Sequence, residues 1–187
     1  MRYAASVARR LGAAAAPLLV VLLACAAVAQ ATPSPSALYQ ALLKQPPAGS
    51  LPPALKGATP KSNALSRGSK AHHAVGAVVI GSTAALVGFL VFPSHALALA
   101  DLKAYPPNTG PNKIVTTTPA GLPRPAYILR AAGNGYESAY AVFVLDNVVV
   151  DAWTYGPKGT YSQIRAIVEK NAQWAKSYAS SVMKSTK

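Results

Sequence analysis

Apolar runs separated by turn residues dominate the C-terminal half of the chain and predict an antiparallel sheet. Residues 126–130 have the composition of a strand. Residues 139–145 and 148–155 are two longer runs joined by Asp146-Asn147. A two-residue connection of this kind is typical of a tight hairpin. We therefore expect at least two paired strands here, with a third beside them.

The register of that hairpin predicts two different faces. With Asp146-Asn147 as the turn, Phe143 lies opposite Val150, and this face is wholly apolar. The other face pairs Tyr140 with Trp153 and also carries Asp151. We therefore expect the apolar face to be buried and the second face to mix aromatic rings with a carboxylate.

Helical periodicity is clearest at the C-terminus. Residues 161–183 alternate apolar and polar positions with the spacing of an amphipathic helix, long enough to cover a sheet. Thr160 and Gln163 have the spacing of a capping box at its start. The apolar stripe consists of Ile164, Ile167, Val168, Ala172, Ala175, Tyr178, Ala179 and Val182.

Residues 74–92 are uncharged and allow two interpretations. Their length and apolarity suit a transmembrane helix. The alternative is a β-hairpin, with strands at 74–80 and 86–92 around a turn at 81–83. The hairpin is favoured because Val and Ile prefer strands and Gly81-Ser82 stands where a turn must fall.

The remaining segments are shorter or rich in proline. We expect a helix at 94–104, then a proline-rich loop over 106–125 with one short strand at 113–118. Residues 32–70 hold seven prolines, and their only helical pattern is at 37–44. This segment is expected to be a lead-in that lies over the domain or stays loose.

These elements predict an α+β domain. Its expected architecture is an antiparallel sheet of about five strands, with helices packed on one face and the long C-terminal helix among them. The predicted organisation is a signal peptide at 1–31, a proline-rich basic lead-in at 32–70 and the α+β domain at 71–187.

The first 31 residues have the pattern of an export signal. Arg2, Arg9 and Arg10 precede an uncharged stretch over 11–29, and small residues then occupy the positions before two possible cleavage sites. We therefore expect the protein to be secreted or located in the cell envelope, on the extracellular side.

Cys25 is the one cysteine of the chain and lies in Leu22-Leu23-Ala24-Cys25. This sequence is similar to the bacterial lipoprotein box, which implies that Cys25 is a candidate lipidation site and a route to membrane association. The other interpretation is soluble secretion, with Cys25 removed along with the signal.

The charge of the chain is strongly positive. Lysine and arginine total 18 against five acidic residues, a formal net charge of +13. Three of the arginines lie in the signal, so the excess belongs mainly to the exported part. Basic residues concentrate over 44–70 and 158–187. Such a surface attracts polyanions, so the expected partner is an anionic envelope polymer or lipid surface, or an unknown protein. Nucleic acid is not expected, because the basic segment has no interleaved aromatic residues.

Tyr140, Asp151, Trp153 and Tyr155 form the candidate ligand-binding group. Aromatic rings offer flat apolar contact, and a carboxylate among them can orient a sugar hydroxyl or a cation. The simpler interpretation is that the C-terminal helix packs on this face and leaves Asp151 at its wet margin.

Few other residues of the sequence suggest metal binding or catalysis. His72 and His73 are adjacent, so on an extended chain they point to opposite sides, and no metal site is expected. Glu137 and Asp151 are the carboxylates without a local role, and glycosidase chemistry would need two that lie close together. We expect neither catalytic residues nor a cofactor.

The chain combines the export signal and the proline-rich lead-in with two further motifs. They are Val75-Gly76-Ala77-Val78 before a strand pair and Asp146-Asn147-Val148-Val149-Val150 before the last helix. This layout resembles small exported bacterial proteins of unknown function, secreted or lipid-anchored. The resemblance implies a location and a fold and supplies no catalytic residues. We therefore expect a non-enzymatic, exported binding domain with a basic surface for anionic partners. A single-pass membrane protein spanning 74–92 and a secreted hydrolase are the alternatives.

Overall fold

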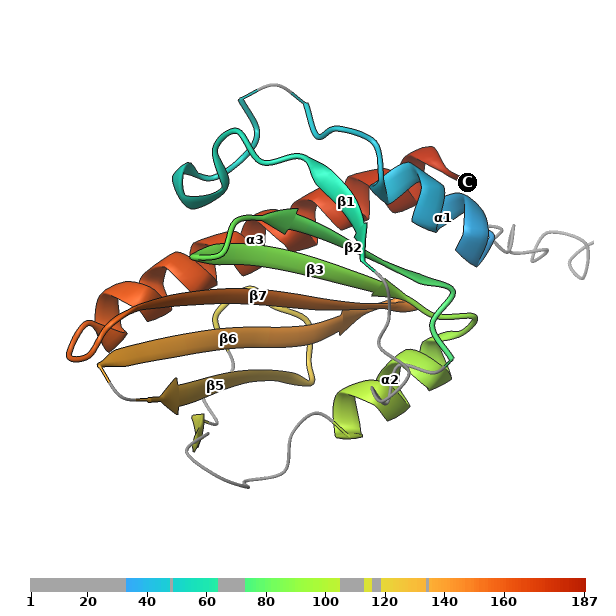
Figure 1. The fold of residues 1–187 in the computed structure, drawn as a ribbon. Helices are drawn as coiled ribbons and strands as arrows, with labels where there is room; N and C mark the ends of the chain where they lie inside the picture. The colour runs from blue at the N-terminus through green and yellow to red at the C-terminus, as the bar shows by residue number, and fades with distance from the viewer. Residues whose placement is uncertain (1–32, 48, 64–72, 105–112, 116–118, 134) are drawn as a thin grey trace, which may run out of the picture. The chain divides into compact units, whose positions relative to one another are not determined.

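A seven-stranded antiparallel sheet is the centre of the structure, a computed structural model (Figure 1). The structure describes residues 33–47, 49–63, 73–104, 113–115, 119–133 and 135–187. The strand order is β1-β2-β3-β7-β6-β5-β4. The strands are β1 (Pro60–Asn63), β2 (Gly76–Gly81), β3 (Ala85–Val91), β4 (Lys113–Val115), β5 (Ala126–Ala132), β6 (Tyr136–Leu145) and β7 (Val148–Pro157). The helices are α1 (Pro35–Leu42), the 3-10 turn η1 (Pro53–Leu55), α2 (His95–Ala104) and α3 (Tyr161–Ser185).

The predicted α+β class, with an antiparallel sheet and a long C-terminal helix, is confirmed. The sheet has seven strands where about five were expected. At one edge, β4 lies within the short strand expected at 113–118. At the other edge, β1 was not expected; it is short and exposed along most of its length. A short edge strand is solvated on one side and needs few apolar residues, so its sequence carries little strand signal.

Residues 74–92 form the predicted hairpin. Strands β2 and β3 pair antiparallel, with Ile80 opposite Val87 and Val78 opposite Phe89. The alternative interpretation of 74–92 as a membrane-spanning helix is therefore wrong. Across the parts of the chain that the structure describes, no helix combines the length and apolarity needed to cross a membrane. Strand β3 also pairs with β7, which places the hairpin beside the centre of the sheet.

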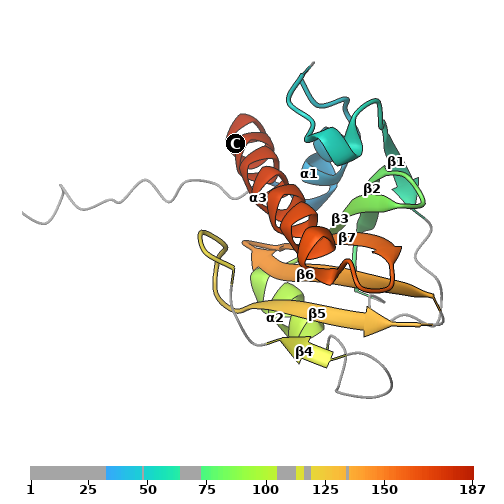
Figure 2. The same ribbon diagram turned by 90° about the vertical axis from the view of Figure 1, so that its left-hand side faces the viewer.

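Helices lie on both faces of the sheet, which corrects the expectation of one covered face (Figure 2). On one face, α3 packs its buried stripe against residues such as Phe89, Phe143 and Val150. On the other face, α2 packs over Val142 and Val149. The reason is the strict alternation of side chains along a strand, which gives β6 and β7 a second apolar row at one end.

The segment predicted as a lead-in belongs to the folded unit, which spans Thr32–Lys187. Its expected short helix is present as α1, shifted by two residues. Leu38, Leu42 and Leu55 are at most 1% exposed and join the same core as α3. The domain therefore begins before residue 71. The predicted signal peptide and Cys25 lie outside the described residues.

Candidate functional site

Three aromatic rings form a continuous row on strands β6 and β7. Tyr140 lies opposite Trp153 in the strand register, and their ring centroids are 5.9 Å apart. Tyr155, two positions further along β7, stands 5.2 Å from the ring of Trp153. Asp151 lies two positions from Trp153 in the opposite direction along β7. We call these four residues, all from the predicted group, the aromatic face.

The aromatic face lies on the side of the sheet away from α3. Side chains at alternate positions share a face, so Asp151, Trp153 and Tyr155 point opposite to Val150 and Ala152, which pack in the α3 core. The interpretation that the C-terminal helix packs on the face of Asp151 and leaves it at the wet margin is therefore wrong. Helix α2 packs on the same side as the aromatic face but further along the strands, over Val149.

The Asp151 carboxylate lies over strand β3, above Gly88. Gly88 is the register partner of Asp151 in β3, and a Cβ placed on Gly88 would collide with Asp151 Oδ1. Val142 is its partner on β6. A glycine at position 88 therefore creates the space that the half-buried carboxylate occupies.

The aromatic face combines buried and accessible parts. Tyr155 is 40% exposed. The indole Nε1 of Trp153 is buried and has no hydrogen-bond partner among the described residues. This arrangement offers a flat apolar surface, an N–H donor and a carboxylate acceptor within a short length of β7. Such a set suits a ligand with one flat apolar face and a polar edge.

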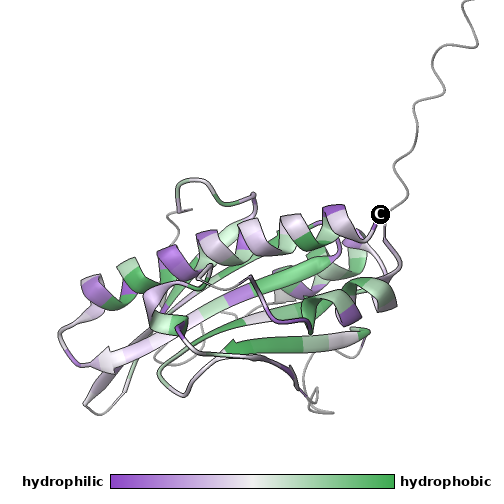
Figure 3. Ribbon diagram, turned by 90° about the horizontal axis from the view of Figure 1, so that it is seen from above, coloured by the Kyte–Doolittle hydropathy of each residue, from purple (hydrophilic) through white to green (hydrophobic). Residues whose placement is uncertain are grey.

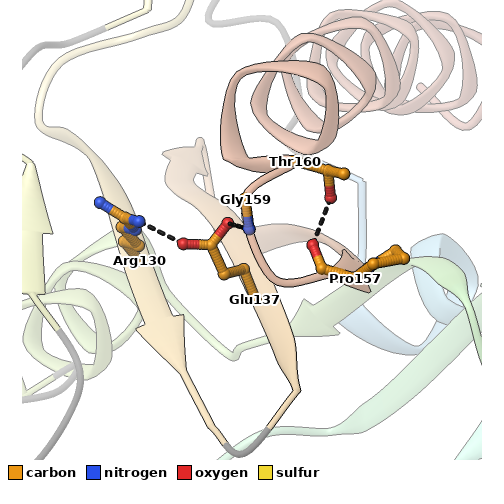
Figure 4. A network of polar contacts seen from close by, with 5 residues as sticks. All are labelled: Arg130, Glu137, Pro157, Gly159 and Thr160. Carbon is orange, nitrogen blue, oxygen red and sulfur yellow. Dashed lines mark hydrogen bonds and ion pairs between the residues drawn. The ribbon is translucent and has the colours of Figure 1, made fainter.

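Glu137 has a different role, in an ion pair at the start of α3 (Figure 4). Its side chain is almost fully buried, and its carboxylate accepts hydrogen bonds from the Arg130 guanidinium and, at 2.9 Å, from the backbone N–H of Gly159. The hydrogen bond from Arg130 is the main reason that the pKa of Glu137 lies below its usual value; burial opposes this lowering, and the Gly159 N–H adds to it. The Arg130 guanidinium also stands over the ring of Tyr161, 4.5 Å from its centroid.

The sheet keeps Glu137 and Asp151 apart. Asp151 lies opposite Val142, five residues along β6 from Glu137, which corresponds to roughly 17 Å. Glu137 points to the α3 side and Asp151 to the other. The two carboxylates do not form the close pair that glycosidase chemistry needs.

The expected capping box is also absent. The hydroxyl of Thr160 donates to the carbonyl of Pro157 at 2.6 Å and does not cap the helix. Glu137 supplies a negative charge there instead, in contact with the backbone N–H of Gly159. A carboxylate at a helix N-terminus is favourable because of the helix dipole.

The histidines do not gather into a metal site. His73 is exposed, His95 Nδ1 contacts the carbonyl of Asp146 at 2.5 Å, and His72 lies outside the described residues. Within the described part of the chain, no three His, Cys, Asp or Glu side chains stand close enough to hold a metal ion.

The structure brings the two basic segments of the sequence together. The Tyr178 hydroxyl of α3 donates to the carbonyl of Lys44 at 3.0 Å, across 134 positions of sequence. η1 also contacts α3. As a result, α1, η1 and α3 lie together on one side of the sheet and carry exposed lysines; we call this side the cationic layer (Figure 2). These lysines are Lys44, Lys56, Lys170 and Lys184.

Most described acidic side chains are sequestered. Glu137 is buried in its ion pair, and Glu169 is paired with Arg165 at 2.8 Å. Asp101 and Asp151 are half-buried, which leaves Asp146, in the β6–β7 turn, as the exposed acid of the described residues. The exposed charge on the cationic layer is therefore positive. The sequence showed each basic cluster but not their contact; the signal for it was the apolar spacing of Leu38 and Leu42 in α1.

Comparison with known proteins identifies no family. No family model matches the chain, and no curated protein matches it either. Among solved structures, the extracellular domain of PknH from Mycobacterium tuberculosis is similar at 16% identity with a TM-score of 0.32. That similarity covers 54% of this chain and 65% of the PknH domain, less than two thirds of its length. A likeness at this level supports no argument about function.

Proposed function

We propose that the protein is an exported, non-enzymatic binding domain that takes an anionic partner on its cationic layer. The observation that carries the proposal is the contact between α1 and α3, which joins two basic segments that are far apart in the sequence. Four exposed lysines then share one layer, and the acid nearest to them on α3, Glu169, is neutralised by Arg165. Clustered charge of one sign raises the local concentration of oppositely charged partners.

Export of the domain is part of the same proposal. It is supported by the basic start, uncharged stretch and small residues of positions 1–31. The test is the N-terminal sequence and mass of the mature protein. A chain that begins after residue 29 or 31 agrees with soluble secretion, and a lipid-modified Cys25 at the N-terminus agrees with an anchor. An intact chain in the cytosol contradicts export.

Binding to a soluble polyanion tests the cationic layer. Heparin is a suitable probe. We expect it to bind at about 0.1 M salt, where the Debye length is about 10 Å, and to be released near 1 M salt, where the Debye length is about 3 Å. The variant Lys44→Gln/Lys170→Gln removes two exposed charges from the layer. The matched control, Lys103→Gln/Arg124→Gln, removes two exposed charges from α2 and from the segment before β5.

The comparison of these two variants decides the proposal. We expect the cationic-layer variant to weaken heparin binding about tenfold and the control to weaken it much less, since both carry the same net charge. Equal weakening would show that only the total charge matters and would contradict a localised binding layer.

A second candidate function is small-ligand binding at the aromatic face. It is favoured by the buried Trp153 Nε1, which has no partner among the described residues, beside a Tyr155 that is 40% exposed. The variant Trp174→Phe leaves Trp153 as the one tryptophan, since the chain has two. Titration with a sugar panel should change Trp153 emission, and Tyr155→Ala should abolish the change. No change with any sugar would contradict sugar binding there.

A further inference from the structure

We infer that the cationic layer docks on an anionic lipid surface, with Ile167 and Trp174 of α3 in contact with the headgroup region. This inference rests on the proposed function and names the partner. It depends on the apolar side chains that the layer presents between its lysines.

Ile167 and Trp174 lie on one flank of α3, beside its buried stripe, and Trp174 also packs in part against the core. They are seven residues apart, two turns of helix, so they share one side of α3. Ile167 is 36% exposed, and Trp174 is half-buried. Lys170, exposed, lies one turn from each of them. Figure 3 shows the resulting alternation of hydrophilic and more apolar turns along the helix that ends at the C-terminus.

The Trp174 ring is held in place by its neighbour. Trp174 and Tyr178 stack with centroids 5.2 Å apart and planes only 5° from parallel. Tyr178 is fixed in turn by its edge contact with Phe89 and by the hydrogen bond from its hydroxyl to Lys44. The indole is therefore oriented before any partner arrives, which lowers the entropy lost on binding.

The same contact places Lys44 beside this flank. The Tyr178–Lys44 hydrogen bond brings the end of α1 to the side of α3 that carries Trp174. Lys44 and Lys170 are both exposed there, and η1, with Lys56 directly after it, also contacts α3. The layer thus places an aromatic side chain beside cations from two separate segments of the chain, Lys44 and Lys170.

This composition favours a lipid surface over a soluble anionic polymer. A polymer of charged groups binds to cations alone and has no need of apolar side chains among them. Tryptophan and lysine together are typical of the membrane–water interface, where the ring lies at headgroup level and the ammonium groups contact anionic lipid. An exposed isoleucine adds apolar area to the same flank.

The two tryptophans lie on opposite faces of the sheet and provide a matched test. Trp174 belongs to the cationic layer and Trp153 to the aromatic face. The probe is a vesicle of phosphatidylcholine with anionic phosphatidylglycerol, some of it brominated so that it quenches a nearby indole. The unsubstituted full chain, Trp174→Phe and Trp153→Phe are measured with the same vesicles, with phosphatidylcholine alone and at high salt.

We expect quenching and a blue shift of Trp174 in the unsubstituted chain and in Trp153→Phe, only with anionic vesicles and at low salt. Trp174→Phe should lose the quenching. Lys44→Gln/Lys170→Gln should reduce vesicle binding about tenfold relative to Lys103→Gln/Arg124→Gln. Because the signal is specific to one face, attachment through the N-terminus does not imitate it.

The other outcomes overturn the inference in distinguishable ways. If heparin binding depends on Lys44 and Lys170 but brominated vesicles leave Trp174 unquenched, the lipid inference is wrong and the proposed function stands. If Trp153 is quenched as strongly as Trp174, docking through the cationic layer is wrong. If neither heparin nor vesicle binding distinguishes the two double variants, the proposed function fails as well.

Discussion

The carboxylate of Asp151 on β7 occupies the space above Gly88 on β3 that any side chain at position 88 would need. The carboxylate is short and half-buried, so it has little freedom to move aside. The lack of a side chain at position 88 of β3 therefore allows Asp151, the one acid of the aromatic face, to lie where it does.

Replacement of Gly88 tests this relationship. We expect Gly88→Ala to lower the free energy of unfolding by about 1–3 kcal/mol, as overpacking in a filled site does. Much of that cost should disappear in the Asp151→Ala background, because the colliding carboxylate is then absent. Urea denaturation of the four proteins of this double-mutant cycle measures the coupling. If the free-energy changes of the two single substitutions sum to that of the double substitution within about 0.5 kcal/mol, the two residues do not collide.

The Glu137 carboxylate should make stability depend on acid pH. The Arg130 hydrogen bond lowers the pKa of Glu137 in the folded protein below the 4.5 that it has when unperturbed. The folded state therefore gains stability from this group above pH 4.5 and loses it as the pH falls through the folded pKa. Glu137→Gln should be less stable than the unsubstituted protein at neutral pH, and the difference should shrink below pH 4.5.

Glu169→Gln is the control for this measurement. Glu169 pairs with Arg165 one turn away on α3, and both side chains are about one-third exposed. An exposed pair of this kind contributes about 0.3–0.5 kcal/mol, so its loss should cost less than the loss of Glu137 at neutral pH. Urea denaturation at several pH values compares the two. A Glu137→Gln difference that does not change with pH would contradict the assigned role of Glu137.

Leu42 should behave as a core residue although it lies in the proline-rich segment. Its side chain is fully buried against the α3 core, so Leu42→Ala should cost about 2–5 kcal/mol. Leu43→Ala, at the half-buried next position, should cost less. Both should unfold in one transition by circular dichroism. A Leu42→Ala protein as stable as the parent would show that α1 is not part of the folded unit.

Tyr178 should make stability depend on alkaline pH. Burial raises the pKa of Tyr178 above its usual 10.0, so the unfolded chain loses this proton first. The stability that the Tyr178 hydroxyl contributes is fully present below pH 10, and it falls as the pH rises through the pKa of Tyr178 in the folded protein. Tyr178→Phe removes that dependence and also the hydrogen bond to Lys44, worth about 0.5–1.5 kcal/mol.

Tyr136→Phe serves as the comparison, since Tyr136 is 49% exposed. We expect the Tyr178→Phe protein to lose stability less steeply above pH 10 than Tyr136→Phe does. Hydrogen exchange should also be faster in α1 of Tyr178→Phe at neutral pH. Unchanged exchange in α1 would contradict the role of this hydroxyl in holding α1 on α3.

The amino-acid sequence predicted the elements whose patterns are local. The hairpin around Asp146-Asn147 was predicted from a two-residue turn between apolar runs, and its register pairs Tyr140 with Trp153 as expected. The long helix from Tyr161 followed from its apolar spacing. Strand β1 was missed because Pro60–Asn63 contains no apolar alternation and pairs only through its backbone.

The sequence by itself determined the α+β class, the two hairpins, the composition of the aromatic face and the excess of positive charge. Only the tertiary structure decided which face α3 covers, that Glu137 is held by Arg130 while Asp151 lies on the other side of the sheet, and that Lys44 and Lys170 share a layer. Local periodicity shows which side of a helix or strand is apolar. It does not show which apolar side meets which, because that choice depends on the packing of all the elements together.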